Sequence, residues 1–138
     1  MNIGEAAKLS GVPAKTIRYY DEIDLIKPSG RTAGGYRDYD ERAVESLRFV
    51  RHARGLGFSV EDCRALLSLY RDRNRASADV KSLTAKHLAR IESKIAELES
   101  MKRTLQDLTA RCQGDDRPDC PILDNLAGPE RSRAEARG

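Results

Sequence analysis

Two cysteines lie close together in the stretch RCQGDDRPDCPI, residues 111–122. Cys112 and Cys120 have seven residues between them, and Gly114 and Pro118 within this run favour a chain that folds back on itself. Such a turn would allow both sulfurs to face one ion. Because a pair of soft thiolates suits Cu(I), Ag(I) or Au(I), the spacing predicts a site for a soft monovalent metal.

The same loop is open to other interpretations. Structural zinc usually takes four ligands, and the loop has no third cysteine and no histidine. Asp115, Asp116 and Asp119 could add harder ligands, so zinc is disfavoured but stays open. The cysteines could also be idle surface thiols, because a pair at this spacing is a weak signal. A redox dithiol is a further alternative, although the spacing is not Cys-x-x-Cys.

A second group of residues, near the N-terminus, could contact nucleic acid. Basic and aromatic side chains of this kind neutralise phosphates and reach base edges from a helix in the major groove. A solvated basic face is the plain alternative, and the expected helix-turn-helix and wing around these residues favour DNA. The candidates are Lys15, Thr16, Arg18, Tyr19, Tyr20, Arg31, Tyr36, Arg37 and Arg54.

The elements that must position these side chains follow from caps and turns. Asn2 and Glu5 form a capping-box pattern at the start of a short helix. Gly11 supplies a turn, and Pro13 suits the first position of a second helix. Two short helices joined in this way predict a helix-turn-helix.

A wing and two further helices are expected to complete this head. The run KPSGRTAGGYRDY breaks any helix, and its Tyr36, together with Tyr39, fits short strands of a hairpin. Asp40 and Ser59 are expected to cap the next two helices. We therefore expect a winged helix-turn-helix DNA-binding domain over residues 1–72.

A long helix is expected over residues 77–111, which contain neither Gly nor Pro. Apolar residues recur there at a spacing of seven, as in Ile91, Leu98 and Leu105, which is typical of a coiled coil. A single stripe of this length needs a partner, so we expect a homodimer. Residues 112–126 would hold the metal-binding loop and a short helix, and residues 127–138 are polar enough to predict a disordered tail.

Composition excludes several classes of protein. Aromatic residues make up 5% of the chain and Trp is absent, which argues against a large aromatic-lined substrate pocket. Cys63 lies among apolar residues and is expected in the core, while His52 and His87 have no catalytic partner at a recognisable spacing. We therefore expect no enzyme. The N-terminal residues predict neither a signal peptide nor a membrane-spanning helix, so we expect a cytoplasmic protein that does not bind membranes.

The residues also resemble a known family. The stretches MNIGEAAKLSGVPAKTIRYYDEIDLI and GGYRDYDERAVESLRFVRHARGLGFSVEDCRALL closely resemble the winged-helix head of MerR-family transcriptional regulators. The long helix agrees with the antiparallel dimerisation helix of that family. The loop CQGDDRPDCPI resembles that of the copper(I)-responsive members. The resemblance thus implies a mainly α protein with a winged head, an antiparallel dimerisation helix and a metal-binding loop.

The resemblance further implies a mechanism and partners. A homodimer would bind double-stranded promoter DNA and, on binding Cu(I), distort it so that RNA polymerase can activate copper-resistance or efflux genes. Members that sense divalent zinc or mercury have a cysteine at the position of Ser77, which would reach the loop of the partner chain, whereas those that sense monovalent ions have serine. The alternatives are a MerR-type regulator of another metal, an oxidant or an organic ligand, and a cytosolic metal-buffering protein.

Overall fold

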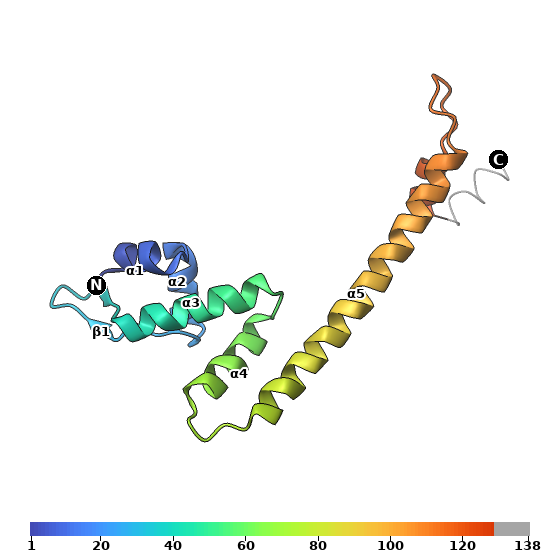
Figure 1. Cartoon of the computed structure of the whole chain (residues 1–138). Helices are drawn as coiled ribbons and strands as arrows, with labels where there is room; N and C mark the ends of the chain where they lie inside the picture. Colours follow the sequence, from blue (N-terminus) through green and yellow to red (C-terminus); the bar gives the residue numbers. More distant parts are fainter. Residues whose placement is uncertain (129–138) are drawn as a thin grey trace. The chain divides into compact units, whose positions relative to one another are not determined.

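The computed structural model describes residues 1–128 of the chain. It is mainly helical, with a small two-stranded sheet (Figure 1). The elements in order are α1 (Ile3–Ser10), α2 (Ala14–Glu22), β1 (Gly30–Arg31), β2 (Arg37–Asp38), α3 (Glu41–Gly55), α4 (Val60–Arg71), α5 (Ser77–Arg111) and α6 (Pro121–Ala127).

The helix starts follow the predicted caps. The side chain of Asn2 accepts a hydrogen bond from the backbone N–H of Glu5 at 2.8 Å and donates to the Glu5 carboxylate at 3.2 Å. Asp40 and Ser59 accept in the same way at the starts of α3 and α4. Such caps satisfy backbone N–H groups that have no partner inside the helix.

The turn between α1 and α2 requires a glycine. Gly11 has φ +77°, in the left-handed region that other residues rarely adopt. Pro13 is the N-cap residue of α2, so this helix begins at Ala14, one residue later than the sequence predicted. The predicted helix-turn-helix is confirmed.

The wing is a hairpin in which β1 pairs antiparallel with β2, with Gly30 opposite Asp38 and Arg31 opposite Arg37. The prediction that Tyr36 and Tyr39 lie in strands is wrong, because Tyr36 directly precedes β2 and Tyr39 directly follows it. Tyr36 belongs to the turn because its N–H is held by the Thr32 side chain at 3.2 Å, and Gly35 has φ +82°. Tyr39 follows β2 and is fully buried.

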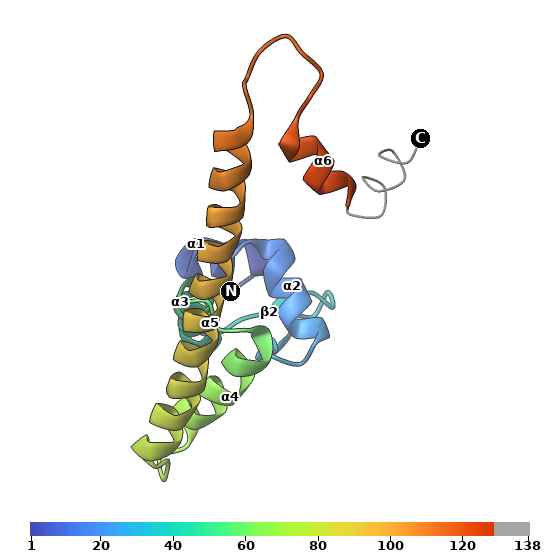
Figure 2. The ribbon, with the colours of Figure 1, turned by 90° about the vertical axis from the view of Figure 1, so that its right-hand side faces the viewer.

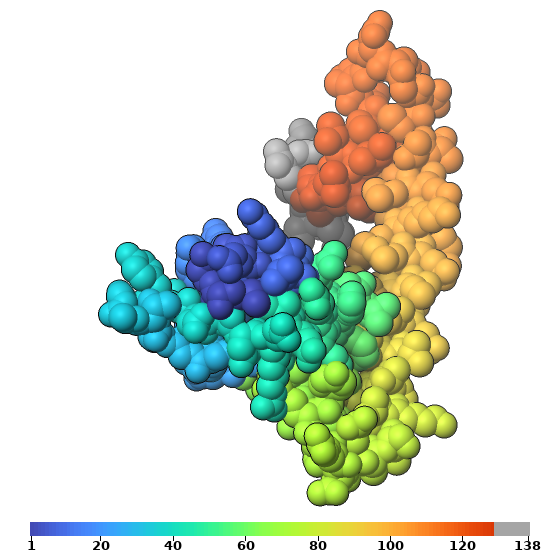
Figure 3. Space-filling view, turned by 60° about the vertical axis from the view of Figure 1, so that its left-hand side comes forward, coloured from blue at the N-terminus to red at the C-terminus, as the bar shows by residue number. Residues whose placement is uncertain are grey.

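One hydrophobic core joins α1, α2, α3 and α4. Its most deeply buried side chains include Ile17, Leu47, Val50 and Cys63, each 0% exposed. In Figure 3, α1 lies against α3, and the wing projects at the edge of this group of helices. The expected core position of Cys63 is confirmed, and burial raises the pKa of its thiol.

The chain divides into two compact units, Met1–His87 and Leu88–Gly138, and α5 passes from the first into the second. Within the second unit the chain turns back after α5, so that α6 runs in roughly the opposite direction to that helix (Figure 2). The short helix predicted after Pro121 is present and includes Ala127, which the sequence had assigned to the tail. Residues 129–138 of that predicted tail lie outside the described part of the chain. Among residues 1–128, no helix is both long and apolar enough to cross a membrane.

Candidate nucleic-acid interface and metal-binding loop

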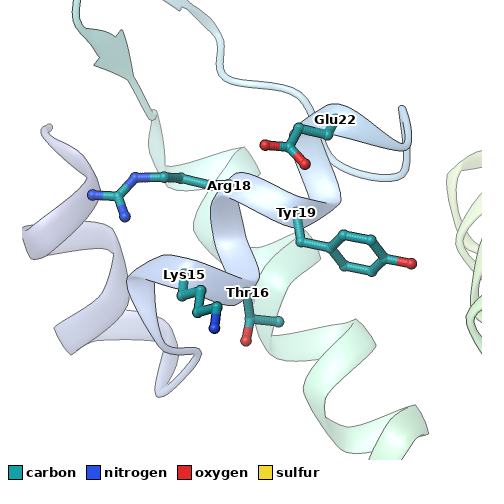
Figure 4. A pocket seen from close by; sticks show the side chains of 5 residues that line it. All are labelled: Lys15, Thr16, Arg18, Tyr19 and Glu22. Carbon is teal, nitrogen blue, oxygen red and sulfur yellow. The ribbon is translucent and has the colours of Figure 1, made fainter.

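The outward face of α2 carries most of the predicted DNA-contacting residues. Ile17 and Tyr20 turn inward to the core and Asp21 is also buried, whereas Lys15, Arg18, Tyr19 and Glu22 are exposed to solvent. A shallow hollow lies along this face, lined by Lys15, Thr16, Arg18, Tyr19 and Glu22 (Figure 4). Two cations, a hydroxyl and a phenol on one exposed helical face can neutralise phosphates and read base edges.

The wing continues this face. A second hollow joins α2 to the hairpin and is lined by Asn2, Ile3, Arg18, Thr32, Tyr36 and Arg37. Arg18 lines both hollows, so it lies at the junction of the helix and the wing. Tyr36 is 75% exposed, and Arg31 is exposed with its Nη1 donating to the Gly35 carbonyl at 3.1 Å.

A buried carboxylate connects these two elements. Asp21, in the last turn of α2, is 6% exposed, and its Oδ2 accepts a 2.8 Å hydrogen bond from Nε of Arg37 on β2. Lys27 lies 3.2 Å from the other oxygen. The hydrogen bond from Arg37 lowers the pKa of Asp21 below its ordinary value of 3.8. The ion pair therefore stabilises the fold at neutral pH, and this stabilisation is lost as the pH falls through that lowered pKa.

Two of the predicted DNA contacts lie elsewhere. Tyr20 is 6% exposed and packs in the core, where burial raises its pKa, so its ring is not on the outward face of α2. The helical period explains this, because Tyr20 lies three residues after the buried Ile17. Arg54 donates from Nη1 to the Phe58 carbonyl at 2.8 Å, which holds the turn between α3 and α4.

Arg18→Ala is expected to weaken DNA binding by about 1–3 kcal/mol, because it removes a cation from the junction of helix and wing. The measurement is fluorescence anisotropy with a labelled duplex that the wild-type protein has selected from a random-sequence pool. Sedimentation should show an unchanged assembly state. Wild-type affinity in this variant would remove Arg18 from the interface.

The two predicted metal-ligating cysteines lie at the two ends of the loop between α5 and α6. Cys112 follows the last residue of α5, and Cys120 is the N-cap residue of α6. Both thiols are free and partly buried. The chain reverses direction over this loop, so that α5 and α6 meet the loop from the same side (Figure 2). The loop thus presents a pair of soft donors.

One carboxylate of the loop is already engaged by a neighbouring residue. Asp115 accepts hydrogen bonds from the backbone N–H of Arg117 at 3.0 Å and from its Nε at 2.8 Å. These bonds lower the pKa of Asp115 and occupy both of its oxygens. Within the described residues, no group of three or more His, Cys, Asp or Glu side chains could hold a metal ion. Cys112 and Cys120 are therefore the soft donors that this loop offers to a metal ion.

Two further residues considered above, Ser77 and His87, lie on α5. Ser77 is exposed and begins the helix. His87, which the sequence left without a partner, is 8% exposed, and its ring stacks on Phe58 at a centroid distance of 4.1 Å. Its Nε2 lies 2.9 Å from the Leu56 carbonyl, so Nε2 carries the proton and donates it. This contact fixes α5 to the turn between α3 and α4.

Two family descriptions match the sequence. "MerR HTH family regulatory protein" matches residues 1–69, which hold α1 to α4 and the wing. "MerR, DNA binding" matches residues 44–108, which reach from α3 to near the end of α5.

Individual relatives agree with these matches. The chain is 57% identical over 127 residues to "Heavy metal-dependent transcription regulator 2" of Rhizobium meliloti, covering 92% of this chain and 86% of the relative. It is 45% identical over 128 residues to the regulator CueR of Salmonella typhimurium, covering 93% of each. Among solved structures, the regulator PbrR691 of Ralstonia metallidurans in complex with lead(II) superposes with a TM-score of 0.79 at 31% identity, covering 91% of this chain and 98% of that one.

Proposed function

Since the chain belongs to the MerR family of helix-turn-helix regulatory proteins, we propose that it is a Cu(I)-responsive activator of transcription, with Ag(I) and Au(I) as alternative ions. Its relatives are transcriptional regulators and not enzymes, and some of them are heavy metal-dependent. The proposal assigns Cys112 and Cys120 as the metal ligands and copper-resistance or efflux genes as the targets.

The observation that carries the monovalent assignment is the donor set of the loop. Two free thiols flank it, and the Asp115 carboxylate is already held by Arg117. Two thiolates carry two negative charges, which suit one monovalent ion, whereas a divalent ion normally takes more ligands. Ser77 supports the same assignment, because a hydroxyl there adds no third thiolate from the partner chain.

The dimer would bring two heads to one promoter. The exposed apolar stripe on α5 supplies a surface for a second, antiparallel helix, and each head would offer α2 and its wing to double-stranded DNA. Metal binding can favour activation only if the metal binds one arrangement of the heads more tightly than the other. We propose that the Cu(I)-bound arrangement distorts the promoter so that RNA polymerase recognises both of its elements.

Run-off transcription under anaerobic, reducing conditions tests the metal assignment. The template carries the selected duplex between the two polymerase-recognition elements, and the wild-type protein is titrated with Cu(I), Ag(I), Zn(II), Hg(II) and Pb(II). We expect activation by Cu(I) and Ag(I) at concentrations where the divalent ions do nothing. Activation by zinc or lead at concentrations where Cu(I) causes no activation would overturn the monovalent assignment. The protein would then be a regulator that responds to another metal.

Ser77→Cys extends the same test, because it adds a soft ligand at the start of α5. If residue 77 of one chain faces the loop of its partner, this variant should gain a response to Zn(II) or Hg(II). Ser82→Cys, which places a thiol five residues further along the same helix, is the matched control and should gain none. An equal gain in both variants would argue for non-specific thiol binding.

A further inference from the structure

We propose that Asp21 is a positioning residue for DNA recognition, which sets the wing against the recognition helix by holding Arg37. This inference rests on the proposed DNA binding and concerns a residue that itself needs no contact with DNA. Asp21 is 6% exposed and lies in the last turn of α2, whereas Arg37 lies on β2, sixteen positions along the chain.

The contact with Asp21 uses only one of the three nitrogen atoms of the Arg37 guanidinium. Nε of Arg37 donates to Oδ2 of Asp21 at 2.8 Å, while the same arginine lines the hollow between α2 and the wing. A guanidinium carries donors on three nitrogens in a fixed plane. With Nε held by Asp21, the two Nη groups are oriented and remain free to bind a phosphate. Arg37 can therefore bind DNA and anchor the wing at the same time.

The local pairing explains why the carboxylate is tolerated on a DNA-binding helix. A buried carboxylate is costly unless it is paired, and Asp21 has Arg37 on one oxygen and Lys27 on the other. The hairpin itself has only two residues in each strand. So short a hairpin is marginal without other support. The N-terminal amino group holds Asp38 of β2 at 2.7 Å, and the Asp21 contact adds support from the recognition helix.

Charge and position give opposite expectations for Asp21→Asn. If Asp21 acted only through its charge, removing it would strengthen binding to a polyanion. If it positions the wing, the variant should bind roughly tenfold more weakly, and the slope of log affinity against log salt should fall by about one as a phosphate contact is lost. Anisotropy with the selected duplex, at several salt concentrations, measures both quantities.

Glu22→Gln is the matched control. Glu22 is the next residue of α2 and is exposed, so this change removes the same charge without touching the wing. We expect it to bind DNA more tightly than the wild type. If Asp21→Asn binds as tightly as Glu22→Gln, the positioning role is wrong. If the wild-type protein selects no duplex at all, the result contradicts the proposed DNA binding and not the role of Asp21.

Arg37→Lys keeps the test valid if Asp21→Asn does not fold. Lysine preserves the charge and can still pair with Asp21, but its single ammonium cannot also serve a phosphate. We expect about the same tenfold loss as in Asp21→Asn, and Arg31→Lys, on the other strand of the wing, should lose far less. Equal small losses in both lysine variants would overturn the proposal. Where Asp21→Asn does fold, adding Arg37→Lys to it should cause little further loss, because the two residues act as a unit.

Discussion

Cys112→Ser and Cys120→Ser are each expected to abolish transcription in response to Cu(I), while the affinity for DNA stays close to that of the wild type. Serine is nearly the same size as cysteine but offers a hard hydroxyl, and the proposed site, which has two ligands, should not bind its ion with only one of them. Both cysteines lie in the second compact unit, whereas the core of the head is complete within residues 1–87. The measurements are run-off transcription and anisotropy on the same samples.

Metal binding itself provides a second measurement for these variants. An ion that binds the folded protein raises its melting temperature by mass action. Cu(I) should therefore raise the melting temperature of the wild type but not that of either serine variant. Asp116→Asn is the matched control, because it removes a carboxylate from the same exposed loop. It should keep both the thermal shift and the transcriptional response. A copper response retained in both serine variants would mean that the cysteines are idle thiols.

Local signals in the sequence were sufficient for most of the helices. The caps at Asn2, Asp40 and Ser59 are side-chain contacts across three residues, and each is present in the structure. The bounds of α5 coincide with the predicted range, because an uninterrupted run without Gly or Pro ends where the glycine-containing loop begins. Such features depend on residues that are close together in the chain, so they can be predicted directly from the sequence.

Long-range contacts were not predictable in the same way. The pairing of Asp21 with Arg37 depends on how the wing folds back on α2, and nothing in the spacing of the two residues signals it. His87 lies on the predicted long helix, yet it packs on Phe58 within its own chain. The first turns of α5 therefore contact the head, and the exposed apolar side chains of this helix begin at Leu88.

The candidate site was predictable in composition more than in geometry. The basic residues of α2 were found by the helical period, but the same period places Tyr20 beside Ile17 in the core, which conflicts with its prediction as a DNA contact. The pairing of Asp115 with Arg117 inside the cysteine loop was likewise not predicted. An Asp side chain commonly accepts a hydrogen bond from the backbone N–H of the residue two positions later, as Asp115 does here.

Leu98→Asp is expected to dissociate the dimer. On α5 the side chains of Leu88, Ile95, Leu98, Met101 and Leu105 are each about half exposed, and they form a stripe that no other described residue covers. A hollow lined by Leu98, Met101 and Leu105 lies along the same stripe. Exposed apolar side chains in such a row are typical of an interface, so a carboxylate at its centre should raise the dimer dissociation constant by at least roughly a hundredfold.

Sedimentation velocity at micromolar concentration measures this effect, with Ser100→Asp as the matched control. Ser100 is two residues further along α5, on the opposite face of the helix, and is exposed. The same charge placed there should leave the dimer intact. Circular dichroism separates dissociation from unfolding, because the head has its own core and should keep its helices in a monomer. A wild-type protein that sediments as a monomer would overturn the coiled-coil interpretation, and with it the proposal that two heads act on one promoter.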